Sequence, residues 1–222
     1  MIIIDLIAGC PIGWPVLFMK LRRLLFVILA IMSLGCRAPE EHSSLSFDTS
    51  LLQEGDLILR RGRSVSSRAV ERADNQNNVY SHIGVLVCED RGWWVIHCVP
   101  GEAAETGGVE VIKFDSLALF LRDDRAEAGA VFRYDTTAEV RTSIAAGARQ
   151  LLQQKVAFDR RYICSDSTEL YCTEMIDLLF RHAGIDLTEG RRHHPPAFRE
   201  PVIYPSDITK NAKLMEIVKG EE

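Results

Sequence analysis

The stretch that most constrains the fold runs from Tyr162 to Phe180 and places a cysteine at the head of an apolar helical stripe. Cys172 comes three and four residues before Met175 and Ile176, the first residues of this stripe, so it lies on the same face, in the first turn of the predicted helix. Gly184 then ends the pattern. The stripe, whose spacing is that of a buried helix face, consists of Met175, Ile176, Leu179, Phe180 and Ala183.

A thiol in the first turn of a helix feels unpaired backbone N–H groups and the positive end of the helix dipole. Both favour the thiolate, so we expect a lowered pKa for Cys172. The same amides could hold an oxyanion during acyl transfer. The alternative is a small, inert, buried side chain. A histidine within reach of Cys172 would decide between the two interpretations.

Composition sets the class of protein. The chain has 222 residues, of which 47% are hydrophobic and 26% charged, as in one ordinary globular domain. The net charge of -5 and the lack of a basic stripe argue against nucleic acid as a partner. Six cysteines without a C-x-x-C pair make a zinc ribbon or a thioredoxin-type site unlikely on spacing grounds.

The N-terminal region reads as an export signal. Met19 opens a positively charged segment, and the apolar run from Leu24 to Leu34 is shorter than the ~20 residues that span a bilayer. We therefore assign residues 1–35 to a signal segment, with 1–18 as a candidate over-extended gene start.

The segment that ends in Cys36 is similar to the lipobox of bacterial lipoproteins, except that Ser33 stands where leucine is usual. The similarity implies acylation of Cys36 and a lipidated tether over 36–50. The expected location is the bacterial cell envelope, on the periplasmic side and at the outer membrane. An uncleaved signal anchor and a secreted protein without lipid remain alternatives.

The remaining chain, residues 51–215, is expected to form one domain. A capping box at Thr136–Glu139 starts the longest predicted helix. After Gly184 the tail is predicted to be irregular, with 201–208 packing back on the core. A turn that leads into a strand is predicted over 52–60. The other predicted strands are 80–88, 93–99, 109–114 and 130–134, and the predicted helices are 64–73, 116–122, 138–155 and the one that begins at Cys172.

The predicted hairpin of 80–88 and 93–99 brings two histidines together. With a two- or four-residue loop, Gly84 lies opposite His97, and His82 lies diagonal to His97 on the same face, roughly 7–8 Å away at the backbone. A three-residue loop would send the two rings to opposite faces. Gly84 would leave room beside them for the Cys172 helix.

A thiol at a helix start and a histidine on a strand are the parts of a cysteine nucleophile site. His82 would take the Cys172 proton and hold the thiolate as an ion pair, and His97 would orient the His82 ring. For each histidine the alternative is a core residue with a satisfied hydrogen bond. Three glutamates could replace His97 as the orienting group, namely Glu102, Glu105 and Glu110.

The order of these motifs resembles the YiiX and YebB-like group of permuted NlpC-type, papain-like cysteine hydrolases. The resemblance rests on Gly55–Ile58, Tyr80–Val85, Phe158–Asp159 and Leu170–Met175. It implies an α+β fold in which a small antiparallel sheet packs against helices. The papain order is circularly permuted in this family, so the histidine strand precedes the cysteine helix.

The resemblance also implies roles for single residues. Cys172 matches the nucleophile, His82 the base, and His97 the third polar position, which is often Glu in the family. Tyr171, Tyr80 and Thr173 are the expected lining of the substrate and oxyanion site, although Tyr171 could equally pack under the helix. The chemistry requires neither a metal nor an organic cofactor.

The implied function is a thiol amidase or peptidase that forms an acyl-enzyme, with cell-wall stem peptides as candidate substrates. Acyl hydrolysis or transfer on lipid amides or esters is the alternative, because the permuted fold resembles lecithin retinol acyltransferase; an apolar groove at Trp93 and Trp94 would favour it. A non-catalytic binding module and a metal site at Cys88, His97 and Cys98 are further alternatives. A lipid on Cys36 would make the membrane a partner, and the oligomeric state stays open.

Overall fold

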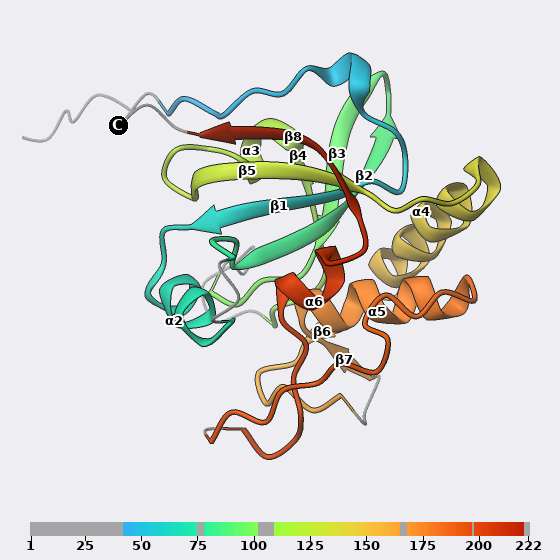
Figure 1. Cartoon of the computed structure of the whole chain (residues 1–222). Helices are drawn as coiled ribbons and strands as arrows, with labels where there is room; N and C mark the ends of the chain where they lie inside the picture. Colours follow the sequence, from blue (N-terminus) through green and yellow to red (C-terminus); the bar gives the residue numbers. More distant parts are fainter. Residues whose placement is uncertain (1–41, 75–77, 102–108, 165–167, 197, 220–222) are drawn as a thin grey trace, which may run out of the picture. The chain divides into compact units, whose positions relative to one another are not determined.

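A six-stranded antiparallel sheet is the framework of the domain (Figure 1). The computed structural model describes residues 42–74, 78–101, 109–164, 168–196 and 198–219. The predicted signal segment and the lipidation site at Cys36 lie outside the described residues. The strands, in the spatial order β4-β3-β2-β1-β5-β8, are β1 (Leu57–Gly62), β2 (His82–Glu89), β3 (Gly92–His97), β4 (Lys113–Ser116), β5 (Ala126–Arg133) and β8 (Lys213–Lys219).

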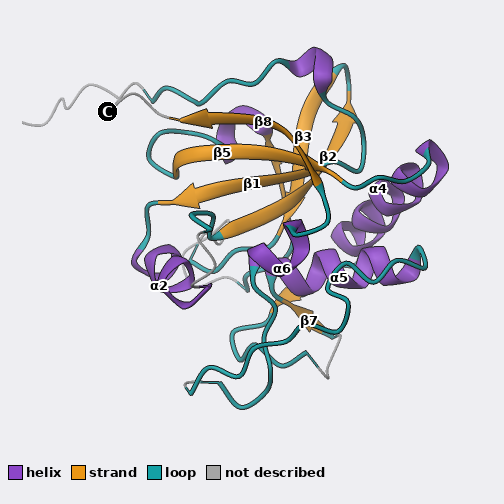
Figure 2. Ribbon diagram, in the orientation of Figure 1, coloured by secondary structure: helices purple, strands orange, loops and turns teal. Residues whose placement is uncertain are grey.

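Helices and one short parallel strand pair complete the described fold (Figure 2). The pair consists of β6 (Ala157–Phe158) and β7 (Glu169–Leu170). The helices are the 3-10 turn η1 (Thr49–Leu51), α2 (Val65–Asp74), α3 (Leu117–Phe120), α4 (Ala138–Gln153), α5 (Cys172–His182) and α6 (Pro205–Thr209). Mixed helices and an antiparallel sheet confirm the predicted α+β class.

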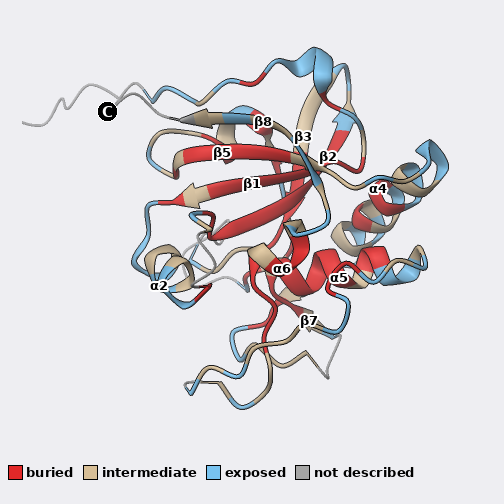
Figure 3. Ribbon diagram, in the orientation of Figure 1, coloured by how far each residue is buried: buried red, intermediate tan, exposed pale blue. Residues whose placement is uncertain are grey.

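The central strands are buried on both faces, which explains their nearly continuous apolar sequences (Figure 3). On one face, Leu59 and Ile83 pack with the apolar stripes of α4 and α5. On the other face, Ile58 and Leu86 pack with Phe120 of α3. Because side chains alternate along a strand, every residue of β1 and β2 is assigned to one of these two faces.

The β2–β3 hairpin has the register that the sequence predicts. Cys88 pairs with Trp93 and Val85 with Ile96, which sets Gly84 opposite His97. A two-residue turn makes the connection, and its residues Asp90 and Arg91 have φ angles of 48° and 66°. Positive φ at both positions is the signature of the turn that suits a right-twisted hairpin.

The regions outside the hairpin are predicted less accurately. The helices over 64–73 and 138–155 are found as α2 and α4, and Thr137 caps α4 as expected. The strand expected over 109–114 instead forms at Lys113–Ser116. The tail carries β8, an edge strand that pairs with β5, where the sequence predicts irregular structure. Leu214 and Ile217 of β8 are exposed, so the strand lacks the alternation that marks a half-buried strand.

In the part of the chain that the structure describes, no helix combines the length and the apolar character needed to cross a membrane.

Gly84 does not face the Cys172 helix, and the expectation that it makes room for that helix is wrong. A Cβ at Gly84 would lie 2.5 Å from Cγ1 of Val95 and 3.0 Å from Cβ of His97. Both neighbours belong to β3. The missing side chain therefore makes room for His97 on the face opposite to α5.

Replacing Gly84 with alanine should destabilise the fold. The added methyl group must displace Val95 or His97, at a cost of about 1–3 kcal/mol in the free energy of unfolding. Gly92→Ala is the matched control in the same hairpin, because its nearest neighbour would be 3.5 Å away. Urea unfolding of both variants measures the difference, and equal stabilities would contradict the packing role of Gly84.

Candidate active site

Two buried histidines are hydrogen-bonded to each other at the open end of the β2–β3 hairpin. His82 is the first residue of β2 and His97 the last of β3. Nε2 of His82 lies 2.8 Å from Nδ1 of His97, and the two residues are 4% and 0% exposed. The diagonal contact that the register predicts is therefore present.

Asp115 extends this pair to a third residue. It lies on β4, the strand next to β3, where Val95 pairs with Asp115 and His97 with Lys113. Its Oδ2 atom lies 3.3 Å from Nε2 of His97. Arg125 donates to the same oxygen at 3.1 Å, and Nζ of Lys113 lies 3.4 Å away. The carboxylate thus joins the histidine pair to two cations.

The charge of Asp115 decides which ring nitrogens carry protons. Burial raises its pKa, but the hydrogen bond from His97 and the positive charges of Lys113 and Arg125 outweigh burial and hold the pKa at about 2. An ionised carboxylate can only accept, so a neutral His97 carries its proton on Nε2 and accepts at Nδ1. His82 must then carry its proton on Nε2, and its Nδ1 keeps a lone pair. This chain of bonds makes His82 Nδ1 a proton acceptor.

His82 is held neutral by its surroundings. Burial lowers its pKa well below the usual value, and the charges of Arg60, His97 and Lys113 lower it further. A neutral imidazole with a free lone pair can act as a base. It does not form the resting ion pair with a thiolate that the sequence predicts.

Cys172 is the first residue of α5 and packs against the cluster that lies under α4 and α5. The helix begins directly after β7, and the backbone N–H of Tyr171 donates to Oε2 of Glu174 at 3.4 Å. This bond closes the first turn. The backbone N–H groups of Thr173 and Ile83 lie near enough to the sulfur to lower its pKa.

The pKa of Cys172 shifts in the direction opposite to the expected one. Burial raises the pKa to about 11, although the amides of Thr173, Ile83 and Cys172 and the charge of Arg60 act to lower it. The sequence argument considered the helix start alone. Burial against the sheet is a tertiary effect, and it outweighs the local amides. The thiol is therefore protonated near neutral pH.

The imidazoles and Cys172 lie on different faces of the sheet, and both are near the start of β2. The rings pack on Phe120 of α3, at 5.6 Å from His82 and 5.0 Å from His97, whereas Cys172 belongs to the face that α5 covers. The Ile83 amide, which acts to lower the pKa of Cys172, belongs to the residue after His82. Among the described residues, no hydrogen bond joins the sulfur to either ring.

The three residues expected to line the site have structural contacts. The Tyr171 hydroxyl accepts from the Ile203 backbone at 3.0 Å, and Thr173 Oγ1 donates to the Ile203 carbonyl at 2.7 Å. Tyr80 is buried and packs edge-on against Phe132 at 6.4 Å. The side chains of Tyr171 and Thr173 thus support the helix start. The backbone N–H of Thr173, and not its side chain, acts to lower the pKa of Cys172.

Of the glutamates considered in place of His97, Glu110 has other partners. Its carboxylate lies 2.7 Å from Nη2 of Arg160 and accepts from the Gly101 backbone. Glu102 and Glu105 lie outside the described residues. Asp115 and Arg60 are the residues that the sequence analysis missed. No sequence pattern marks Asp115 as a site residue, because its role depends on the register of β4 against β3.

The described residues offer one group with the spacing of a metal site, and it lies elsewhere. It consists of His42, Asp123 and Asp124. Asp123 accepts from the Ser43 backbone at 3.1 Å and Asp124 from Arg122 at 2.7 Å, so both carboxylates have protein partners. The alternative metal site at Cys88, His97 and Cys98 is not formed by these side chains.

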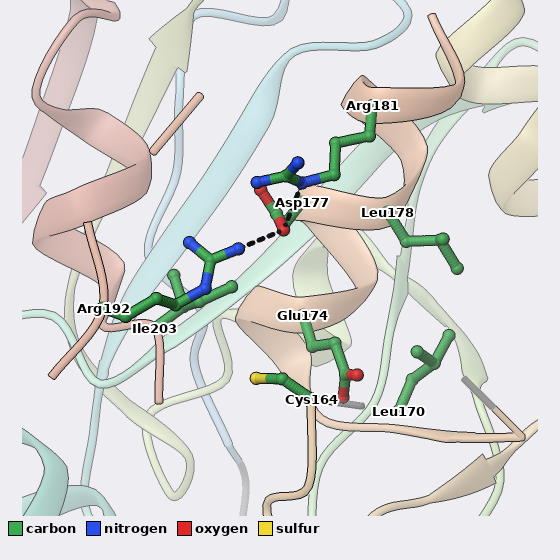
Figure 4. Close-up of a pocket in the computed structure, with 8 residues that line it drawn as sticks. All are labelled: Cys164, Leu170, Glu174, Asp177, Leu178, Arg181, Arg192 and Ile203. Atoms are coloured by element: carbon green, nitrogen blue, oxygen red, sulfur yellow. Dashed lines mark hydrogen bonds and ion pairs between the residues drawn. The ribbon is translucent and has the colours of Figure 1, made fainter. Parts of the chain in front are cut away.

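A pocket of about 280 Å³ lies beside α5 (Figure 4). By helical spacing, the residues of α5 that line it are on the helix face opposite to Cys172. Asp177 lies in its wall, and Oδ2 of this residue accepts from Arg181 at 2.9 Å and from Arg192 at 3.0 Å. The pocket's lining does not include Cys172, His82 or His97. It is therefore separate from the candidate active site.

Asp115→Ala should disturb the protonation of both histidines. The variant removes the acceptor that holds the His97 proton on Nε2, so the ring can take its proton at Nδ1 and lose the bond from His82. Nitrogen NMR of the rings should show a loss of the Nε2–H forms, with a stability cost of about 1–3 kcal/mol. The exposed Asp135→Ala is the control, and unchanged ring tautomers in Asp115→Ala would overturn the assignment.

Comparisons with known proteins place this chain in a family. A comparison with curated proteins gives no match. The solved structure of the metalloprotein yiiX from Escherichia coli O157:H7, DUF1105, matches with a TM-score of 0.59 and 19% identity, covering 74% of this chain and 96% of that chain. The model of the permuted papain-like amidase enzymes, YaeF/YiiX, C92 family, matches residues 51–217. The chain therefore belongs to the permuted papain-like amidase family YaeF/YiiX, as its motifs predict.

Proposed function

We propose that this protein is a cysteine-dependent amidohydrolase that cleaves peptide-type amides through Cys172, His82 and His97. The observation that carries the proposal is the bond series from Asp115 through His97 to His82. It leaves a proton acceptor at the start of β2, one residue before the Ile83 amide that acts to lower the pKa of Cys172. Membership in an amidase family supports the reaction class.

The reaction begins with a neutral thiol and a neutral imidazole. As the Cys172 sulfur bonds to the substrate carbonyl carbon, its proton passes to Nδ1 of His82, and the carbonyl electron pair moves to oxygen. The amides at the start of α5 are suitable donors to that oxyanion. The carbon–nitrogen bond then breaks, and the His82 proton goes to the leaving amine. Water, with His82 again as the base, hydrolyses the thioester.

His97 and Asp115 act through His82. The bond from His82 Nε2 to His97 holds the ring with Nδ1 free, and Asp115 stabilises the positive charge that forms on the histidine pair. Lys113 and Arg125 keep Asp115 ionised. In this role, His97 and Asp115 are positioning residues.

The placement of the tryptophans does not favour a lipid substrate. Trp93 pairs with Cys88 beside the hairpin turn, at the end of the hairpin away from His82 and His97. Trp94 is stacked on Phe114, with ring centroids 4.5 Å apart. An apolar groove of these side chains at the nucleophile was the feature that would favour acyl lipids. Cell-wall stem peptides remain the proposed substrate class.

Cys172→Ala should abolish hydrolysis. Incubation of the full-length protein with muropeptides should release amide-cleavage products, and loss of the nucleophile should slow release by on the order of 10⁴-fold or more. His82→Gln should cost about 10²–10⁴-fold. Mass spectrometry of acid-quenched reactions should detect an acyl group on Cys172.

The exposed thiol variant Cys88→Ser is the control and should keep full activity. Phospholipid vesicles are the competing substrate. Cleavage of lipid esters alone would replace the amidase proposal with a lipid acyl hydrolase. Cleavage of neither substrate class, with no labelled Cys172, would favour the binding module.

We also propose that the domain is anchored to the bacterial outer membrane, on the periplasmic side, by a lipid on Cys36. The proposal rests on the signal-like segment before that cysteine. Cys36→Ser should prevent incorporation of labelled palmitate and release the protein from the membrane fraction. Cys10→Ser is the control and should leave labelling unchanged, and labelling of the Cys36→Ser protein would refute the anchor.

A further inference from the structure

The residues on either side of Cys172 are both hydrogen-bonded to one residue of the tail. The hydroxyl of Tyr171 accepts from the Ile203 backbone N–H at 3.0 Å. On the other side, Oγ1 of Thr173 donates to the Ile203 carbonyl at 2.7 Å. Tyr171 and Thr173 are only 2% and 1% exposed, so solvent does not compete for these bonds. The backbone of Ile203 therefore fixes the chain immediately before and immediately after the candidate nucleophile.

The start of a helix is a place where such support matters. The first backbone N–H groups of a helix have no acceptor within the helix, and terminal turns open more easily than the middle. Serine, threonine, aspartate and asparagine are preferred before the first turn, because their short side chains accept from these amides. Tyr171 occupies that position in α5, and its hydroxyl bonds to Ile203. Glu174 supports the turn from within the helix, whereas Ile203 supports it from outside.

Ile203 is itself held firmly. Its side chain is 3% exposed and belongs to the core cluster under α4 and α5. The residue before it, Val202, exchanges two backbone hydrogen bonds with His193, at 2.8 and 2.9 Å. The residue after it, Tyr204, donates its backbone N–H to Asp207 at 2.9 Å, at the start of α6. Core packing and bonds on both sides thus make Ile203 a rigid support.

The segment around Ile203 is also attached to an element other than α5. Ser206 of α6 donates its backbone N–H to Asp74 at 3.2 Å, and its hydroxyl donates to the same carboxylate. Asp74 is the last residue of α2 and is 2% exposed. α6 lies beside α5 (Figure 1). Residues 202–207, which we call the tail brace, therefore connect the first turn of α5 to α2.

The later part of α5 is held to the tail by charged groups instead. Asp177 accepts from Arg181 at 2.9 Å and from Arg192 at 3.0 Å. Beyond the end of the helix, the hydroxyl of Thr188 donates to Asp186 at 2.9 Å, and Thr188 is 0% exposed. Thr188 therefore offers a buried threonine hydroxyl in the same tail, at the end of α5 away from Cys172. Its loss serves as a matched control.

We propose that Tyr171 and Thr173 are positioning residues that hold Cys172 in place through the tail brace. This inference rests on the proposed function. The two side chains act through the backbone: with both neighbours fixed, the Cα–Cβ bond of Cys172 keeps one direction, and so does its thiol. A misplacement of about 1 Å at a reacting group can cost about 10²-fold in rate. The C-terminal tail is therefore part of the framework of the active site.

Thr173→Val tests the proposal, because it keeps the shape of the side chain and removes the hydroxyl. With full-length protein and muropeptides, kcat should fall about tenfold or more while KM stays nearly unchanged, since the substrate contacts remain. Thr173→Ser restores the hydroxyl and should recover most of kcat. Tyr171→Phe removes the other bond and should also lower kcat. Thr188→Val should keep the kcat of the unmodified protein.

Alkylation by iodoacetamide at pH 8, followed by mass spectrometry of the thiol peptides, gives a second measurement that needs no substrate. Cys98 is 0% exposed and belongs to the core cluster on which Cys172 packs, so it is an internal reference. In Thr173→Val, local opening of the first turn should raise the alkylation rate of Cys172 relative to Cys98. The expected factor is about fivefold, which corresponds to the loss of one buried hydrogen bond.

A purely structural role of Thr173 makes different predictions. Global destabilisation would raise the alkylation of Cys98 and Cys172 together and would leave the kcat of the folded enzyme unchanged. Either result in Thr173→Val would overturn the proposal. Should Thr173→Val fail to fold, Tyr171→Phe makes the same two predictions. A selective rise in Cys172 alkylation, in a protein that does not cleave muropeptides, would contradict the proposed function and support the role of the tail brace.

Discussion

The pairing of β2 with β3 is the constraint on which the rest of the site depends. Because side chains alternate along strands, this register alone sets His82 and His97 on one face and within 2.8 Å of each other. A slip of one residue would send one ring to the face that α5 covers. The two-residue turn and the missing side chain of Gly84 both favour the observed register.

The local parts of the site could be predicted from sequence. The hairpin is short, its turn length is nearly fixed, and the apolar stripe of α5 gives the position of Cys172 in the first turn. The contributions of Asp115 and Arg60 could not be predicted in the same way. Each depends on which strand lies next to the hairpin, and sequence patterns do not encode strand order.

The error in the expected pKa of Cys172 has the same origin. A helix start predicts a lowered value, and the amides do act in that direction. Packing against the sheet contributes the larger, opposite effect. The direction therefore follows from how deeply the first turn of α5 is buried, which is a property of the assembled domain. The edge strand β8 was missed for a related reason, since its exposed apolar side chains carry no clear periodicity.

The attachment of the chain's described beginning to α3 has a mechanical consequence. Ser43 donates to Asp123, and the Leu45 backbone donates to the Leu121 carbonyl, immediately after the helix that holds Phe120. Tension on the polypeptide ahead of residue 42 would be transmitted to the support of the imidazoles before it reached the sheet. A pull on the chain ahead of residue 42 and the position of the His82 imidazole are thus linked through the short helix α3.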